Sequence, residues 1–183
     1  MEIISKAKPN LAHYSLAELE GRGTLKCLIT QNVDGLHRRA GSKRVIELHG
    51  SIWRVRCVRC GYRADVEEPP EELPPVCPNC GSPLRPDVVW FGEPIPRGAW
   101  EGALEEVSKS DVLLVIGTSG TVVPAALIPR MASERGVTVI EVNPEDTPIT
   151  KISTFKVSST AVEFFRRFKL MCKSDFTFSS NRL

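Results

Sequence analysis

Two Cys-x-x-Cys hooks constrain this chain more than any other feature. They read Cys57-Val-Arg-Cys60 and Cys77-Pro-Asn-Cys80, and a glycine follows each second cysteine. Paired hooks of this kind are typical of a zinc site in which four thiolates surround the metal as a tetrahedron. Because four protein ligands leave no position for water, we expect the zinc to be structural and not catalytic.

Disulfide bonds and a redox-active dithiol are the two alternatives for these cysteines. Disulfides need an oxidising compartment, and the first six residues lack the charged and then apolar regions of a signal peptide. A redox hook usually lies in a βαβ unit, whereas the flanks here are rich in turn residues. The cysteines therefore fit a protein of the reducing cytoplasm.

The length and composition set further limits. A chain of 183 residues suits one domain, or one domain with a small inserted module, and a hydrophobic share of 42% is ordinary for a globular protein. No apolar run approaches the ~20 residues of a membrane span. Arginines lie near the first hook at positions 54, 56, 59 and 63, but a formal net charge of +2 argues against nucleic-acid binding.

The second half of the chain predicts a βαβ unit. The segment 111–117 has the pattern of a buried strand, a helix is expected over about 124–135, and 137–142 is the next strand. The turn Gly117-Thr118-Ser119-Gly120 can hold an anion or nucleotide at the helix N-terminus. Asn143-Pro144-Glu145 follows the second strand, where a polar side chain can reach a ribose. The turn is not Gly-x-Gly-x-x-Gly, so it is weak as a dinucleotide fingerprint.

The first half carries a second polar cluster. A buried strand is expected over 25–30, and Gln31 to His37 follow it directly. Ligands bind beyond the carboxyl ends of strands in open α/β sheets, but a polar turn that caps the next helix has the same pattern. His49 lies in the segment 45–50, seven residues before the first hook, and so at the expected junction between the sheet and the zinc module. It is either a general base or a structural histidine. We expect helices at 9–20, 99–109 and 160–168.

The segments on either side of the second hook are expected to be a loop and an edge strand. Residues 66–76 are acidic and rich in proline, which predicts a loop. Val88 to Phe91 form an apolar run closed by Gly92, typical of a short exposed strand and turn. Such an edge can pair with an extended peptide, although Trp90 and Phe91 could instead pack the seam between the module and the main domain.

In this order, the motifs resemble those of the sirtuins, a family of NAD-dependent protein-lysine deacylases. The resemblance covers about residues 8–168 and rests on a combination of motifs: Thr30 to His37, Leu48-His49-Gly50, the paired hooks, Val89 to Glu93, Gly117-Thr118-Ser119, and Asn143. It implies a Rossmann-type domain with a smaller zinc module, and NAD and an acyl-lysine peptide that meet in the cleft between them.

The resemblance also implies roles for single residues. His49 would be the general base that deprotonates a ribose hydroxyl, while the acyl oxygen displaces nicotinamide. The products would be nicotinamide, free lysine and O-acyl-ADP-ribose. The expected cofactor contacts are Asn32 and Asp34 at nicotinamide, Gln31 at its ribose, Gly117, Thr118 and Ser119 along NAD, Asn143 and Glu145 near the adenosine ribose, and Ala161 near the adenine. The expected peptide contacts are Val89, Trp90, Phe91, Gly92 and Glu93, with the Val89 carbonyl accepting from the acyl-lysine N–H and Phe91 walling the acyl channel.

The chain also departs from the family pattern. The first strand with its Gly-Ala-Gly-x-Ser segment and the following cofactor loop are absent, and Gly120 stands where the family usually has leucine. The chain therefore resembles a sirtuin truncated at its N-terminus. We expect the incomplete sheet to lower stability or to promote self-association through its exposed edge.

The predicted fold is α/β, with an incomplete Rossmann-type NAD-binding domain over 1–48 and 95–170, a zinc module and substrate-pairing strand over 49–94, and a loose tail over 171–183. The expected function is NAD-dependent deacylation of acylated lysine in a protein or peptide. The alternatives are a non-catalytic fragment that binds acyl-peptides or a partner, and an ADP-ribosyltransferase.

Overall fold

A computed structural model describes residues 1–171, and most of the predicted tail, 172–183, lies outside the described residues. The chain divides into two compact units. The first comprises Met1–Pro9 and Leu16–Glu106, and the second comprises Asn10–Ser15 and the chain from Val107 onward. Among the described helices, none has the length and apolar character that crossing a membrane requires. The division predicted from the sequence, with 49–94 as a separate module, stays a prediction.

The first unit contains a two-stranded parallel sheet of β1 (Leu28–Thr30) and β2 (Val45–Glu47). Leu28 lies beside Val45 and Thr30 beside Glu47. The Leu48 amide donates to the Thr30 carbonyl at 2.9 Å, so the pairing continues one step beyond β2. The ends of both strands therefore lie next to each other, and their following residues share one edge.

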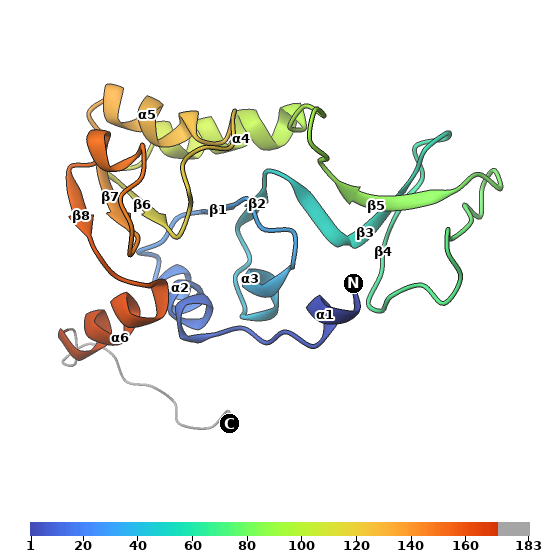
Figure 1. The fold of residues 1–183 in the computed structure, drawn as a ribbon, viewed down its shortest axis with the longest axis horizontal. Coiled ribbons are helices and arrows are strands. Elements are labelled where there is room, and N and C mark those ends of the chain that lie inside the picture. Colours follow the sequence, from blue (N-terminus) through green and yellow to red (C-terminus); the bar gives the residue numbers. More distant parts are fainter. Residues whose placement is uncertain (172–183) are drawn as a thin grey trace. The chain divides into compact units, whose positions relative to one another are not determined.

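An antiparallel sheet follows at once. Its order is β4 (Arg63–Asp65), β3 (Gly50–Cys57), β5 (Leu84–Val88), and Figure 1 shows β3 and β5 side by side. The register shifts between Ser51 and Val55, which marks a bulge in β3. One end of this sheet has its own small core. Its buried members are Val55, Cys57, Cys77 and Leu84, with Tyr62, Ala64, Val66 and Cys80 packed against them.

Helices complete the first unit. They are α1 (Glu2–Ser5), α3 (Leu36–Arg39), most of α2 (Leu11–Gly21) and most of α4 (Arg97–Ser108). The Asn10 carboxamide oxygen accepts from the Ala12 amide at 3.0 Å and so caps α2.

The second unit is a parallel sheet in the order β6 (Val112–Ile116), β7 (Thr138–Val142), β8 (Phe155–Val157). The central strand β7 is the most buried, since Val139 and Val142 have no exposed surface. The helix α5 (Leu127–Glu134) packs on β6 and β7 and is drawn beside them in Figure 1. A short 3-10 turn, η1 (Thr150–Ile152), and α6 (Ala161–Met171) follow.

The α/β prediction is confirmed, and the expected βαβ unit is present as β6, α5 and β7. One expected strand is wrong. The strand near the second hook is Leu84–Val88, and Val89 to Glu93 form no strand. The physical reason lies in the turn that follows, because the Glu93 amide donates to the Trp90 carbonyl at 2.9 Å and Gly92 adopts a φ of 87°.

Candidate functional site

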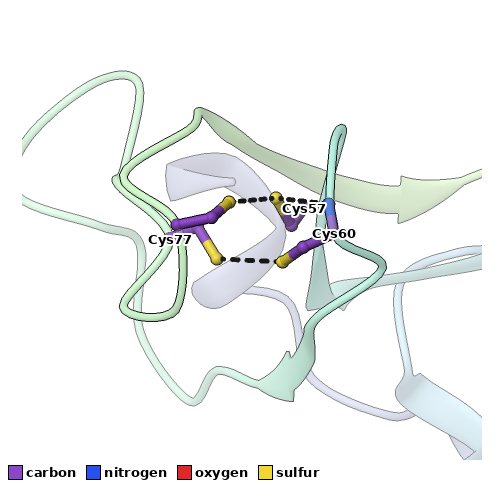
Figure 2. Close-up of side chains that lie close together, drawn as sticks. Cys57, Cys60 and Cys77 are labelled. Carbon is purple, nitrogen blue, oxygen red and sulfur yellow. Dashed lines mark hydrogen bonds between the residues drawn. The ribbon is translucent and has the colours of Figure 1, made fainter.

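The four hook cysteines meet in the first unit. Their sulfur atoms all lie within 4.8 Å of one another, with 3.5 Å between the Cys57 and Cys80 sulfurs and 3.6 Å between those of Cys60 and Cys77. Figure 2 shows the sulfurs of Cys57, Cys60 and Cys77 turned toward one another. A disulfide would need about 2.0 Å between its sulfurs, so these four thiols are free.

The donor set fits zinc. Four thiolates at about 2.3 Å from a metal lie about 3.8 Å apart along the edges of a tetrahedron, close to the two observed separations. The amides of Cys60 and Arg59 donate to the Cys57 sulfur and favour its thiolate form. A thiolate is the form that binds a metal. The predicted four-cysteine cluster is therefore confirmed.

His49 lies on the two-residue turn between β2 and β3. Its Nδ1 is 3.1 Å from the carbonyl oxygen of Gln31, the first residue after β1. Because a carbonyl only accepts, we assign the imidazole proton to Nδ1, which leaves the lone pair of Nε2 to accept a proton. In its backbone, the His49 carbonyl accepts from the Val89 amide at 2.9 Å. Gln31, His49 and Val89 are thus brought together.

The loop after β1 is held in place by a tryptophan. The Trp53 indole donates to the Asp34 carbonyl at 2.7 Å, and the Ile52 amide donates to the Val33 carbonyl at 3.0 Å. The indole also fills the space beside Gly35, where a Cβ would lie 2.8 Å from a ring carbon. Asn32, the second residue of this loop, is exposed. The loop that the sequence singles out is therefore rigidly attached to β3.

Asp34 has a structural contact of its own. Its carboxylate accepts from the Leu36 amide at 2.9 Å, at the start of α3. The sequence allowed two roles for this polar segment, a ligand site or a turn that caps the next helix, and this contact is the second of them. One carboxylate oxygen is used in this contact, and a carboxylate can accept several hydrogen bonds, so the cap and a ligand contact are compatible.

The turn after β5 presents its aromatic side chains to solvent. Phe91 is 98% exposed and Trp90 is 55% exposed. The Arg85 guanidinium donates to both oxygens of Glu93 and lies 5.6 Å from the centre of the Trp90 ring. Arg85 and then the Trp90 amide lower the pKa of Glu93 to about 2. The Glu93 carboxylate is therefore occupied in fixing the turn.

Three of the four arginines near the first hook form ion pairs. Arg54, Arg56 and Arg63 all lie within 3.5 Å of the Asp87 carboxylate, and Arg56 also approaches Glu93 at 3.6 Å. Arg54 reaches Glu47 as well, at 3.5 Å. These charges therefore neutralise acidic groups on β2, on β5 and in the turn after β5.

In the second unit, Asn143 joins the two loops that the sequence predicts to hold a nucleotide. Its Nδ2 donates to the Thr118 carbonyl at 2.8 Å, and its Oδ1 accepts from the Glu145 amide at 3.2 Å. Asn143 is buried, while Ser119 and Glu145 are exposed. Ala161 is the first residue of α6, and the Thr160 hydroxyl caps that helix at the Glu163 amide.

The predicted residues thus form three groups: the cysteines, the cluster around Gln31, His49 and Val89, and the loops of Thr118, Asn143 and Glu145. The first two groups lie in the first unit and the third in the second. The Sir2 family model matches residues 1–124, about two thirds of the chain. The chain belongs to the Sir2 family.

This Sir2 chain is similar in sequence to named deacylases and in structure to solved Sir2 homologues. A protein of Pyrobaculum aerophilum named NAD-dependent protein deacylase 2 is 56% identical over 166 residues, which cover 91% of this chain and 67% of that protein. The crystal structure of a Sir2 homologue–NAD complex superposes with a TM-score of 0.91 at 47% identity, covering 95% of this chain and 68% of that one. A structure titled Sir2 bound to acetylated peptide superposes with a TM-score of 0.86 at 41% identity, covering 92% of this chain and 72% of that one.

Sequence reasoning missed several residues that build this Sir2 site. Trp53, Arg85 and Asp87 hold the loops and the turn, yet none belongs to a motif that stands out by spacing. Alternation along 50–57, Gly-Ser-Ile-Trp-Arg-Val-Arg-Cys, was an available signal for β3. Glu141 is a further case, because it interrupts an apolar strand with a charge.

Proposed function

We propose that this chain transfers the acyl group of a modified lysine in a protein to the ADP-ribose part of NAD. One water is consumed, and the products are nicotinamide, free lysine and O-acyl-ADP-ribose. NAD would supply the ribose that receives the acyl group and a nicotinamide that departs. The proposal also assigns the protein to a reducing compartment such as the cytoplasm, which is supported by the free thiols of the described cysteines.

One observation carries the proposal: the convergence of three segments at His49. The His49 imidazole contacts the Gln31 carbonyl, and the His49 carbonyl accepts a hydrogen bond from the Val89 amide. A general base must lie within hydrogen-bond reach of the group that it deprotonates. Here the base adjoins both the loop expected at the nicotinamide ribose and the segment expected at the peptide.

The chain's own residues have separate tasks. Nε2 of His49 would take a proton from a ribose hydroxyl, and the Gln31 carbonyl would stabilise the imidazolium by accepting from Nδ1. Gln31, Asn32 and Asp34 would contact the nicotinamide side of NAD. Asn143 and Glu145 would contact the adenosine ribose, and Gly117, Thr118 and Ser119 would line the rest, with Ala161 near the adenine.

The turn after β5 would bind the peptide. Val89 would accept a hydrogen bond from the acyl-lysine N–H through its carbonyl, and the exposed ring of Phe91 would wall the acyl group. Trp90 and Gly92 would contribute backbone contacts. Glu93 would act indirectly, because Arg85 occupies its carboxylate.

The zinc would have a structural role in this proposal. Cys57, Cys60, Cys77 and Cys80 would hold it, and the metal would fix the far end of the β3–β5 sheet. We treat residues 49–94 as the zinc module that carries the peptide-binding turn, and 1–48 with 95–170 as the nucleotide-binding part.

The function is tested by substituting the proposed base. We expect His49→Ala to lower peptide-dependent nicotinamide release by at least about 100-fold, the usual contribution of a general base. His13→Gln is the matched control, since His13 lies on α2 and contacts Asn10. Equal rates for His49→Ala and wild type, both folded and loaded with zinc, would refute the assignment.

A further inference from the structure

Glu141 is a buried acid that the proposed chemistry does not use. It lies on β7 between Ile140 and Val142 and is 1% exposed. Burying a charge is costly unless the charge is paired and hydrogen-bonded. A carboxylate in the middle of the most buried strand of the second unit therefore needs partners, and the structure supplies three.

Two threonines and a lysine satisfy the carboxylate completely. The Thr147 hydroxyl donates to Oε1 at 2.6 Å, the Thr150 hydroxyl donates to Oε2 at 2.6 Å, and the Lys156 ammonium lies 3.3 Å from Oε2. Burial alone would raise the pKa of Glu141, but these hydrogen bonds and the Lys156 charge hold it below its usual range. Glu141 is thus an anion with fixed donors.

The same threonines define the path of the backbone after β7. The Thr147 hydroxyl accepts from the Ile149 amide at 3.0 Å, and the Thr150 hydroxyl accepts from the Thr147 amide at 2.9 Å. Lys156 also donates to the Glu145 carbonyl. Because each hydroxyl accepts from the backbone and donates to Glu141, a single carboxylate ties the segment 145–150 at three points.

The other side of this segment meets the Gly117–Gly120 turn. Asn143 reaches the Thr118 carbonyl at 2.8 Å. A Cβ on Gly120 would lie 2.8 Å from Cγ1 of Ile149, and Gly120 has a φ of 65°. The two loops are packed so closely that only glycine fits at this position. A shift of 145–150 would therefore displace the residues expected to contact the adenosine ribose.

We propose that Glu141 is a positioning residue which, through Thr147, Thr150 and Lys156, sets the geometry of the loop that carries Asn143 and Glu145. The inference rests on the proposed function, because the proposed function assigns the adenosine ribose of NAD to that loop. In the sequence, the arrangement reads Glu-x-Asn-x-Glu-x-Thr-x-x-Thr over 141–150.

Stability alone does not require such a network. Replacing a buried ionic cluster with apolar residues of similar volume is often neutral or stabilising. What the network adds is one defined loop conformation, which matters where a ligand must be held within a fraction of an ångström. A purely stabilising role predicts a change in the free energy of unfolding, whereas a positioning role predicts a change in affinity for the adenosine part of NAD.

The test removes the two hydroxyl donors without changing side-chain volume. We expect the double variant Thr147→Val, Thr150→Val to bind ADP-ribose on the order of tenfold more weakly. The KM for NAD should rise by a similar factor, while kcat, the KM for the acyl-peptide and inhibition by nicotinamide change by less than about twofold. The matched double variant Thr147→Ser, Thr150→Ser keeps both hydroxyls and should restore ADP-ribose affinity.

Three outcomes would count against the inference. Wild-type ADP-ribose affinity in the folded valine variant would overturn it, and so would an equal loss of kcat and of affinity for both substrates, which indicates general damage. If the valine variant does not fold, Lys156→Met removes one donor to the same carboxylate, and unchanged ADP-ribose affinity there would overturn it. By contrast, wild-type protein that binds no ADP-ribose would overturn the proposed function itself.

Discussion

At the scale of single residues, the site depends on two glycines that admit no side chain. Gly35 lies against the Trp53 ring, and Gly50 follows His49 with a φ of 75°. A Cβ on Gly50 would lie 2.0 Å from the Asp87 carbonyl oxygen, a backbone atom of β5 that cannot move independently. The close approach of β3 and β5 at this point fixes the turn that carries His49.

We predict that Gly50→Ala lowers the free energy of unfolding by about 3 kcal/mol or more, because left-handed strain and a backbone clash add together. Gly23→Ala is the matched control. Gly23 has a φ of 74° and open space around its Cβ position, so only the strain of about 1–2 kcal/mol should remain. Urea unfolding measures the free energy of unfolding of both variants. An equal decrease in the two variants would contradict the prediction, because it would show that the backbone clash at position 50 costs nothing.

His49 shows what a sequence can and cannot reveal about a residue. Its place shortly before the first hook suggested a junction, and in the structure it lies between β2 of one sheet and β3 of the next. The sequence could not indicate its partner, because the Gln31 carbonyl is a backbone atom with no side-chain signature. The proton assignment on Nδ1 follows only from that contact.

At the scale of elements, the small sheet β4–β3–β5 lacks an apolar interior of ordinary size. Its cluster has four buried residues, and two of them are the cysteines Cys57 and Cys77, which are expected to bind the zinc. Ion pairs around Asp87 tie its strands on the other side. A domain of this kind usually needs a metal to fold.

We predict that Cys77→Ser abolishes stoichiometric zinc binding and lowers the melting temperature, whereas Cys27→Ser, outside the cluster, retains about one zinc per chain. Elemental analysis and thermal unfolding give both quantities. Hydrogen exchange should show lost protection in β3 and β5 and retained protection in β6 and β7. Full zinc content in Cys77→Ser would contradict a four-cysteine site.

The elements that sequence reasoning located are those with a continuous apolar pattern. The strands expected at 111–117 and 137–142 are observed as Val112–Ile116 and Thr138–Val142. The strand β3 was missed because its arginines pair with Asp87 and its interior is partly made by the cysteines. The helix expected from 124 begins only at Leu127.

At the scale of the whole molecule, the residues expected at NAD are divided between the two units. Gln31, Asn32 and Asp34 belong to the first, and the loops of Thr118, Asn143 and Glu145 belong to the second. The sequence assigns all of them by resemblance, but each loop is held by contacts inside its own unit, through Trp53 in one and Glu141 in the other. Self-association through open sheet edges stays a prediction.

The most direct test of the central claim is the stoichiometry of the reaction. Zinc-loaded protein is incubated with NAD and an acetyl-lysine peptide, and mass spectrometry quantifies nicotinamide, deacetylated peptide and O-acetyl-ADP-ribose. We predict equal amounts of all three, formed only when NAD and peptide are both present. Nicotinamide release without deacetylated peptide, or no turnover by folded protein, would contradict a protein-lysine deacylase.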